Sequence, residues 1–410
     1  MAIKQNTFWK GLFTLVSLLS AISLATAKSE SNPPAAAYGK TLPRLAGAML
    51  PHKSLDLFSH ADCLKLSKVN LAGWDFGAQT NGVYSPGSTG VAPPKTQIPH
   101  FIKQNVNLLR VPVAWGFIQP EINKELNATN ANIYREFIED ITSRGAYAII
   151  DLHAYARNNG EIVGESPQMP ASVLVNLWLK LGALFKDNKQ VILGLSNEPH
   201  DQSIEKWAVT VQTLVTAMRK DGINNILLLP GTDWTSLKAF PDWYKSMKTV
   251  KNPDGSFDGL WFEAHRYLDG DNSGKSRECV ASHADEVVSI AKMLKEDGRQ
   301  ILLGETGGGS TESCKKYLPE LVEAVANAYP HFAGFAIWSA GAFDATYELV
   351  VTVKDESSPT GWKDQENWLS IKKFLPTHPP TAHKKAADKG AKEQEKNKGS
   401  KHGRRSIVSN

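Results

Sequence analysis

Short apolar segments alternate with longer amphipathic segments along most of the chain, and this alternation constrains the fold more than any other feature. The apolar segments have the length and composition of buried β-strands. Strands and helices in strict alternation indicate parallel βα units, in which each helix returns the chain to the same sheet. The predicted strands lie at residues 68–74, 107–113, 146–152, 191–197, 225–230, 259–264, 300–305 and 334–338.

The stretches between the strands predict helices. One of them begins with Ser203, a good N-terminal cap, and ends with Arg219, whose charge suits a helix C-terminus. The predicted helices lie at residues 98–104, 130–143, 171–185, 203–219, 281–295, 314–328 and 367–374. Together these elements predict an α/β fold, a single (β/α)8 TIM barrel over residues 66–375. A doubly wound sheet shares the alternation, but it usually has fewer strands and often a glycine-rich first turn, which this sequence lacks.

The first 27 residues have the composition of a secretory signal peptide. Lys4 and Lys10 form a positive n-region, residues 12–24 are apolar, and Ala25-Thr26-Ala27 is a small-residue cleavage site. The apolar run is shorter than the ~20 residues that a membrane-spanning helix needs. We therefore expect a secreted, extracellular protein with no transmembrane segment. Residues 28–65 have little periodicity and are expected to form an N-terminal lead-in.

Residues 376–410 form a basic tail with almost no apolar side chains, which predicts a disordered segment. An electrostatic anchor to anionic wall polymer, lipid or a host surface is the alternative function for this tail. The net charge of the whole chain is +4. Residues 377–410 contribute +6 and residues 1–27 contribute +2, which leaves −4 on the body. A mildly acidic body gives no support to nucleic-acid binding.

Three cysteines are compatible with an oxidising compartment. Cys279 and Cys314 lie on either side of the segment that carries Glu305, and we expect them to pair. Cys63 is left over, and the sequence alone leaves other pairings open.

Two predicted strands end in glutamate, at Asn197-Glu198-Pro199 and at Gly304-Glu305. The C-terminal ends of all strands of a (β/α)8 barrel converge on one face. We therefore expect Glu198 and Glu305 to face each other across an active site. The other polar and aromatic residues predicted at this face are Arg110, Trp115, Asp151, His153, Asn197, Trp234, His265, Tyr267 and Trp338.

Paired carboxyl groups of this kind are what glycoside hydrolysis requires. One protonates the leaving oxygen and the other attacks the anomeric carbon. Arg110 near Glu305 would keep that carboxylate ionised, and Tyr267 would donate a hydrogen bond to it. Asn197 is expected to bind the sugar 2-OH, and Trp338 to offer a flat face to the C–H surface of the sugar.

Each candidate also has a structural alternative. A single glutamate at a strand end more often forms a structural ion pair, but two such glutamates favour catalysis. His153 and His265 lack H-x-H or H-E-x-x-H spacing, so no metal or cofactor is expected. Trp115 and Trp234 are equally compatible with the core and with sugar stacking, and Asp151 is expected to support the site structurally. Ser196 is not in a G-x-S-x-G turn, which argues against a serine hydrolase.

Six motifs in order give the chain a recognisable resemblance. They include Asn197-Glu198-Pro199-His200 and occupy residues 69–77, 109–113, 151–153, 197–200, 265–269 and 304–308. The chain resembles glycoside hydrolase family 5 over residues 66–374. Residues 268–274, 278–279 and 338–344 resemble its secreted endo-β-1,4-glucanase branch.

The resemblance implies retaining hydrolysis of β-1,4-glucan by double displacement, without a cofactor. It implies that Glu198 is the acid/base and Glu305 the nucleophile, and that a Cys279–Cys314 disulfide is present. It also implies a cleavage subsite lined by Arg110, His153, Asn197, His265, Tyr267 and Trp338. We expect a monomer whose partner is the polysaccharide substrate.

Two other functions are also compatible with the sequence. The same barrel could act on mannan, xyloglucan or mixed-linkage glucan, or the chain could be a secreted carbohydrate-binding protein without activity. Many secreted members of the branch carry a Cys-rich cellulose-binding module, and this chain has only the basic tail. Soluble or amorphous glucan is therefore the expected substrate rather than crystalline cellulose.

Overall fold

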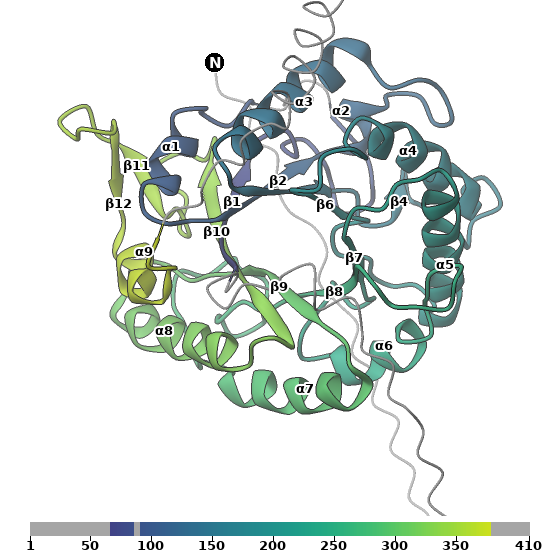
Figure 1. Cartoon of the computed structure of the whole chain (residues 1–410). Helices are drawn as coiled ribbons and strands as arrows, with labels where there is room; N and C mark the ends of the chain where they lie inside the picture. The colour runs from purple at the N-terminus through teal and green to yellow at the C-terminus, as the bar shows by residue number, and fades with distance from the viewer. Residues whose placement is uncertain (1–65, 86–90, 379–410) are drawn as a thin grey trace, which may run out of the picture. The chain divides into compact units, whose positions relative to one another are not determined.

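A closed barrel of eight parallel strands forms the centre of the computed structural model, which describes residues 66–85 and 91–378 (Figure 1). Neighbouring strands follow the order β1-β10-β9-β8-β7-β6-β3-β2. The strands are β1 (Leu66–Ala72), β2 (Leu108–Val113), β3 (Tyr147–Leu152), β6 (Val191–Gly194), β7 (Leu227–Pro230), β8 (Leu260–His265), β9 (Ile301–Thr306) and β10 (Phe332–Gly341). The predicted (β/α)8 barrel is confirmed, and each predicted strand overlaps one of these.

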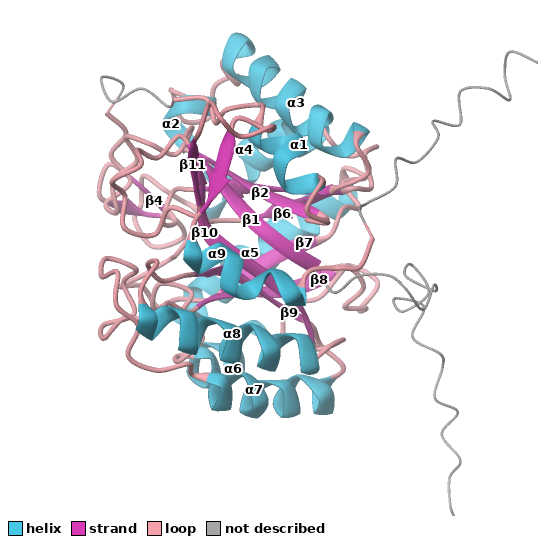
Figure 2. Cartoon of the chain, turned by 90° about the vertical axis from the view of Figure 1, so that its left-hand side faces the viewer, coloured by secondary structure: helices cyan, strands magenta, loops and turns pink. Residues whose placement is uncertain are grey.

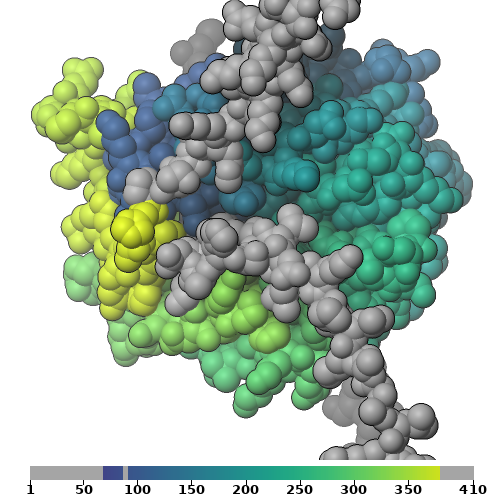
Figure 3. Space-filling view, in the orientation of Figure 1, coloured from purple at the N-terminus to yellow at the C-terminus, as the bar shows by residue number. Residues whose placement is uncertain are grey.

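Helices lie around the outside of the barrel (Figure 1), and Figure 3 shows the packed outer surface of the molecule in the same orientation. They are α1 (Gln97–Ile102), α2 (Trp115–Ile118), α3 (Ala128–Ser143), α4 (Ala171–Ala183), α5 (Ile204–Lys220), α6 (Phe240–Met247), α7 (Ala284–Asp297), α8 (Glu312–Asn327) and α9 (Glu366–Ile371), followed by the 3-10 turn η3 (Lys372–Phe374). Side-chain caps set several starts, since Ser203 accepts a hydrogen bond from the backbone N–H of Lys206, and Thr311 accepts one from that of Cys314.

The sequence did not predict α6, which follows β7 after a short connection. This helix has only eight residues, and a proline in its first turn interrupts the sequence pattern. Its buried face is aromatic and made of Phe240, Trp243 and Tyr244. Two small hairpins were also missed, β4 (Arg157–Asn158) with β5 (Glu161–Ile162), and β11 (Thr352–Lys354) with β12 (Trp362–Asp364). Figure 2 shows β4 and β11 among the loops at one end of the barrel.

The inside of the barrel has an apolar layer and a polar layer. Near the N-terminal ends of the strands it is filled by Leu108, Ile149, Ile192, Leu228, Trp261, Leu302 and Ala333. Because strand side chains alternate in direction, the inward positions two residues further along β2, β3 and β8 are Arg110, Asp151 and Glu263. These three side chains are almost fully buried. The apolar layer therefore supports a polar layer that opens toward the C-terminal ends of the strands.

A disulfide between Cys279 and Cys314 is present, as expected. It joins the loop after β8 to the first turn of α8. Gly308 packs directly against it, because a Cβ atom at position 308 would overlap both sulfur atoms. The chain-entropy model gives a cross-link of this separation a contribution of about 3–4 kcal/mol to stability. The disulfide therefore fixes the segment that follows Glu305.

Several predictions lie outside the described residues. They are the signal peptide at 1–27, the lead-in at 28–65 with Cys63, and all but the first residues of the basic tail, from 379 to 410. Within the described ranges, no helix has both the length and the apolar composition needed to cross a membrane.

Candidate active site

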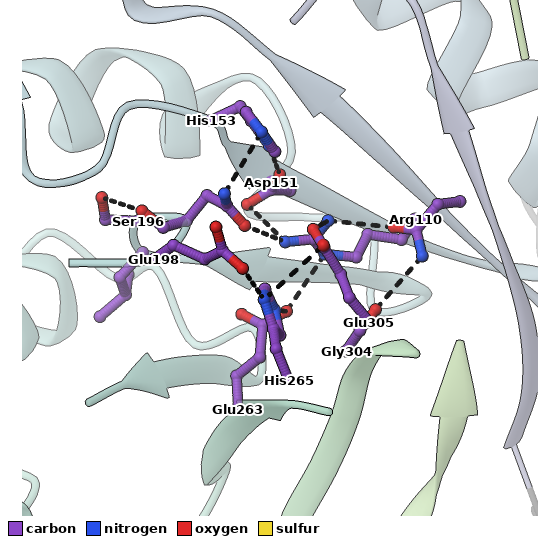
Figure 4. A network of polar contacts seen from close by, with 12 residues as sticks. Arg110, Asp151, His153, Ser196, Glu198, Glu263, His265, Gly304 and Glu305 are labelled. Atoms are coloured by element: carbon purple, nitrogen blue, oxygen red, sulfur yellow. Dashed lines mark hydrogen bonds and ion pairs between the residues drawn. The ribbon is translucent and has the colours of Figure 1, made fainter. Parts of the chain in front are cut away.

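Glu198 and Glu305 come together at the C-terminal ends of their strands, as the sequence predicted (Figure 4). His265, at the end of β8, lies between them. Its Nδ1 atom is 2.8 Å from Glu198 Oε1 and 3.7 Å from Glu305 Oε2. One ligating oxygen of each carboxylate and one nitrogen of His265 all lie within 4.8 Å of one another.

A β-bulge in β9 directs Glu305 into this site. Ala264 pairs with Leu303 and His265 pairs with Glu305, so Gly304 is an extra residue in β9. Bulges of this kind bend a strand and change the direction of a side chain. The bulge places Glu305 beside His265 instead of one position further along the strand.

Glu305 is held by two donors and is nearly buried, with 3% of the residue exposed. Arg110 Nη1 donates to Oε1 over 2.7 Å, and the Tyr267 hydroxyl donates to Oε2 over 2.7 Å. Burial raises the pKa of Glu305, while the charges of His265 and Arg110 oppose that rise. The ionised form of this carboxylate therefore depends on the two neighbouring cations.

Glu198 has a different environment, because 18% of its side chain is exposed and its hydrogen-bond partner is His265. Its φ of 42° lies in the left-handed region, which non-glycine residues rarely adopt. The chain turns sharply here after β6, and Pro199 follows directly. The two carboxyl groups thus differ in exposure and in partners, as two different catalytic roles require.

His265 carries a positive charge in this arrangement. Burial alone would favour the neutral ring, but the carboxylates of Glu305, Glu198 and Glu263 raise the pKa of His265 to about 10. The protonated ring donates through Nδ1 to Glu198, so its charge lies between the two facing carboxylates.

Arg110 connects several strands from a fully buried position. Besides Glu305, it donates through Nη2 to Asn197 Oδ1 over 2.8 Å. Ion pairs join it to Asp151 at 3.0 Å and to Glu263 at 3.1 Å. The predicted contact between Arg110 and Glu305 is confirmed, and Asp151 has the supporting position expected of it. A buried guanidinium with this many partners is fixed in one orientation.

His153 and Trp338 form the neighbouring wall of the site. His153 Nδ1 donates to Asp151 Oδ2 over 2.9 Å, and its Nε2 lies 3.2 Å from the Asn197 amide nitrogen. Burial disfavours the charged ring, but Asp151 raises the pKa of His153 to about 8. Trp338 stacks on His153 with ring centroids 5.9 Å apart, and its Nε1 donates to the Tyr347 hydroxyl.

The two tryptophans that the sequence left open have different positions. Trp115 is 3% exposed and belongs to the main hydrophobic core, so it is a core aromatic residue. Trp234 is 38% exposed and stacks on His200 with ring centroids 3.8 Å apart. It lies in a left-handed turn, with φ between 53° and 59° for residues 233–235. That strained turn places a flat indole ring near the protein surface.

Sequence reasoning missed Glu263 and Asn70. Glu263 is a buried carboxylate inside β8, and Asn70 in β1 accepts from Arg110 Nη1 over 3.0 Å. Its amide also donates to the carbonyl oxygens of Gly304 and Ile337. The available signal was a polar residue at an inward position within a mostly apolar strand. That signal becomes informative only when the direction of each side chain is known.

Glu198, His265 and Glu305 are also the one group of histidine, cysteine, aspartate or glutamate side chains, among residues 66–85 and 91–378, that is close enough to hold a metal ion. His265 Nδ1 donates a hydrogen bond to Glu198, so a metal ion bound by this nitrogen would have to displace that proton and that hydrogen bond.

Comparison with known proteins gives consistent matches. A family model described as Cellulase (glycosyl hydrolase family 5) matches residues 70–341. The manganese dependent endoglucanase Eg5A of Phanerodontia chrysosporium is 39% identical over 318 residues, covering 76% of this chain and 80% of the relative. Endoglucanase 1 of Saitozyma flava is 37% identical over 339 residues, covering 81% of this chain and 96% of the relative. The crystal structure of Cel5A (EG2) from Hypocrea jecorina (Trichoderma reesei) matches with a TM-score of 0.71 and 34% identity, covering 75% of this chain and 98% of that one.

Proposed function

The chain belongs to glycosyl hydrolase family 5, and from this premise we propose that it is an endo-β-1,4-glucanase that cleaves internal bonds of β-glucan with retention of configuration. The observation that carries the proposal is the approach of Glu198 and Glu305, whose nearest oxygens lie within 4.8 Å. Retaining glycosidases place their carboxyl groups about 5–5.5 Å apart, whereas inverting ones leave about 6.5–9.5 Å for a water molecule.

In the first step, Glu305 attacks the anomeric carbon and Glu198 protonates the departing glycosidic oxygen. Glu305 is the better nucleophile because Arg110 and Tyr267 fix both of its oxygens. Glu198 is the better acid/base because it is more exposed and has Glu305 as its facing carboxylate. In the second step, Glu198 takes a proton from water while the water oxygen attacks the anomeric carbon. The bond between that carbon and the Glu305 carboxylate breaks, which releases the sugar and restores the free carboxylate.

The remaining site residues bind the sugar or hold the groups that do. Asn197 directly precedes Glu198, and its Oδ1 accepts a hydrogen bond from Arg110, which also donates to Glu305. We assign Asn197 to the 2-OH, whose hydrogen bond strengthens in the transition state. Trp338 supplies an apolar face for the sugar ring, with His153 stacked behind it. Arg110, His265 and Tyr267 complete the cleavage subsite through their contacts with Glu198 and Glu305.

We further propose that the protein acts outside the cell as a monomer. The signal-like composition of residues 1–27 and the fungal relatives named endoglucanases support an extracellular location. The Cys279–Cys314 disulfide is consistent with an oxidising environment.

A substrate panel tests the proposed activity. We expect the purified chain to release reducing ends fastest from carboxymethyl-cellulose or amorphous cellulose, with a rapid fall in solution viscosity because internal bonds are cut. Initial rates on mannan, xyloglucan and mixed-linkage glucan provide the comparison. A clearly higher rate on mannan would contradict the glucanase assignment, and binding without any hydrolysis would favour a carbohydrate-binding protein.

A further inference from the structure

Glu263 is a buried carboxylate of β8 to which the proposed reaction mechanism gives no role. Only 1% of the residue is exposed, and its side chain points into the barrel beneath the active site. Burying a charge is costly unless it is paired with charges of the opposite sign. The partners of Glu263 therefore indicate why a carboxylate is kept at this position.

Both partners of Glu263 are cations that contact the catalytic carboxylates. Arg110 Nε donates to Glu263 Oε1 over 3.1 Å, while Nη1 of the same guanidinium donates to Glu305. His265 Nε2 lies 3.5 Å from the same Oε1 atom, while Nδ1 of that ring faces Glu198 and Glu305. Within the described part of the chain, His265 Nε2 has no closer hydrogen-bond acceptor. The Oε1 atom of Glu263 thus contacts both cations, through nitrogens other than those that face the catalytic carboxylates (Figure 4).

The neighbouring strand leaves space for this carboxylate. Gly304, the bulge residue of β9, lies directly over the Glu263 side chain, and a Cβ atom there would overlap Oε1. Glycine inside a strand commonly marks such a close approach. Gly304 is therefore both the extra residue of the bulge before Glu305 and the residue whose missing side chain leaves room for Glu263.

The other charged groups around Glu263 do not replace it. Lys68 of β1 is fully buried, and burial lowers its pKa well below the usual range, although the charge of Glu263 opposes that shift. Its Nζ atom has no hydrogen-bond partner within residues 66–85 and 91–378. Asp151 of β3 contacts a different guanidinium nitrogen of Arg110, Nη2, and it also contacts His153. His265 therefore has Glu263 as the only carboxylate contacting its Nε2 side in the described structure.

We propose that Glu263 is a positioning residue of the hydrolysis, which orients Arg110 and His265 toward Glu305 and Glu198 and balances their charge. This inference rests on the proposed glycosidase function. Glu263 itself does not touch the substrate, because the polar layer of Arg110 and His265 covers it. Its removal should therefore affect the chemical step and its pH dependence more than substrate binding.

The test compares E263Q with the wild-type chain on soluble carboxymethyl-cellulose. Without the Glu263 charge, the pKa of His265 falls from its raised value, and Arg110 and His265 lose the shared carboxylate that orients them toward Glu305 and Glu198. We expect kcat to fall about 10–100-fold with KM changed less than about twofold. The alkaline limb of the kcat/KM profile should move to lower pH by roughly half a unit or more, since His265 loses its proton at a lower pH.

Two further variants separate positioning from a merely structural role. E263D keeps the charge, so its alkaline limb should return toward that of the wild type even if kcat stays low. K68M removes a buried amine that has no hydrogen-bond partner among the described residues and leaves Glu263 with its contacts in place, so its pH profile should match the wild type. A wild-type pH profile and kcat in folded E263Q would overturn the inference.

If E263Q does not fold, E263D provides the decisive variant, because it withdraws the carboxylate from Arg110 and His265 by one methylene group while keeping its charge. A folded E263D with unchanged kcat would overturn the inference, and a reduced kcat with unchanged KM would support it. Absence of activity in the wild-type chain on every β-glycan would instead contradict the proposed function.

Discussion

Replacing Glu305 with glutamine is expected to abolish turnover of β-1,4-glucan while leaving the protein folded and able to bind it. Glutamine has nearly the same shape but cannot form the glycosyl ester, and we expect kcat to fall by about 10⁴-fold or more. Arg110 keeps Asp151 and Glu263 as ionic partners, so it is not left with an uncompensated charge. Reducing-end release measures turnover, and affinity electrophoresis in soluble glucan measures binding.

The matched control for this variant is E312Q. Glu312 lies in the first turn of α8, and 91% of its side chain is exposed. This variant tests whether a Glu-to-Gln change outside the active site alters turnover, and its activity should equal that of the wild type. Substantial turnover by E305Q would contradict the nucleophile assignment. Loss of both binding and folded structure would show instead that Glu305 is needed for stability.

Replacing Glu198 with alanine should lower kcat on polysaccharide by about 10²–10⁴-fold, because the departing sugar oxygen no longer receives a proton. An aryl cellobioside with a strongly activated leaving group needs no protonation, so its first step should remain fast. Azide should then restore turnover, because a small anionic nucleophile needs no general base and can enter the space left by the side chain.

The product of this rescue reports the stereochemistry. The double displacement predicts a β-glycosyl azide, which proton NMR identifies from the coupling constant of the anomeric proton. An α-glycosyl azide would contradict retention, and no rescue at any azide concentration would contradict the acid/base role of Glu198. The exposed control variant E312Q should not respond to azide.

The barrel was predictable because its strands are buried on both sides and therefore appear as continuous apolar runs. Glu198 and Glu305 could be placed for the same reason, since a polar residue that ends such a run lies at the C-terminal face. Helix α6 was not predictable, because it has only eight residues and follows a left-handed turn. Local propensity carries little information for an element of this length.

The polar layer beneath the active site was the part that the sequence could not reveal. Arg110 and Glu263 are 153 residues apart, and they meet only because the barrel closes. Gly304 appears in the sequence as an ordinary small residue of an apolar strand, but the structure places it at a bulge and over a carboxylate. The register between neighbouring strands decides whether a charged side chain points into the barrel or away from it. The pattern of one strand alone does not define that register.

The most direct test of the proposed mechanism is to trap the covalent intermediate. A 2-deoxy-2-fluoro cellobioside with an activated leaving group forms the glycosyl ester but slows its hydrolysis. After incubation of the wild-type chain and proteolysis, mass spectrometry should find one added fluorocellobiosyl group, on the peptide that contains Glu305 and on that residue. The E305Q variant should stay unlabelled. A label on Glu198 or on any other residue, or full inactivation without a covalent adduct, would contradict double displacement at Glu305.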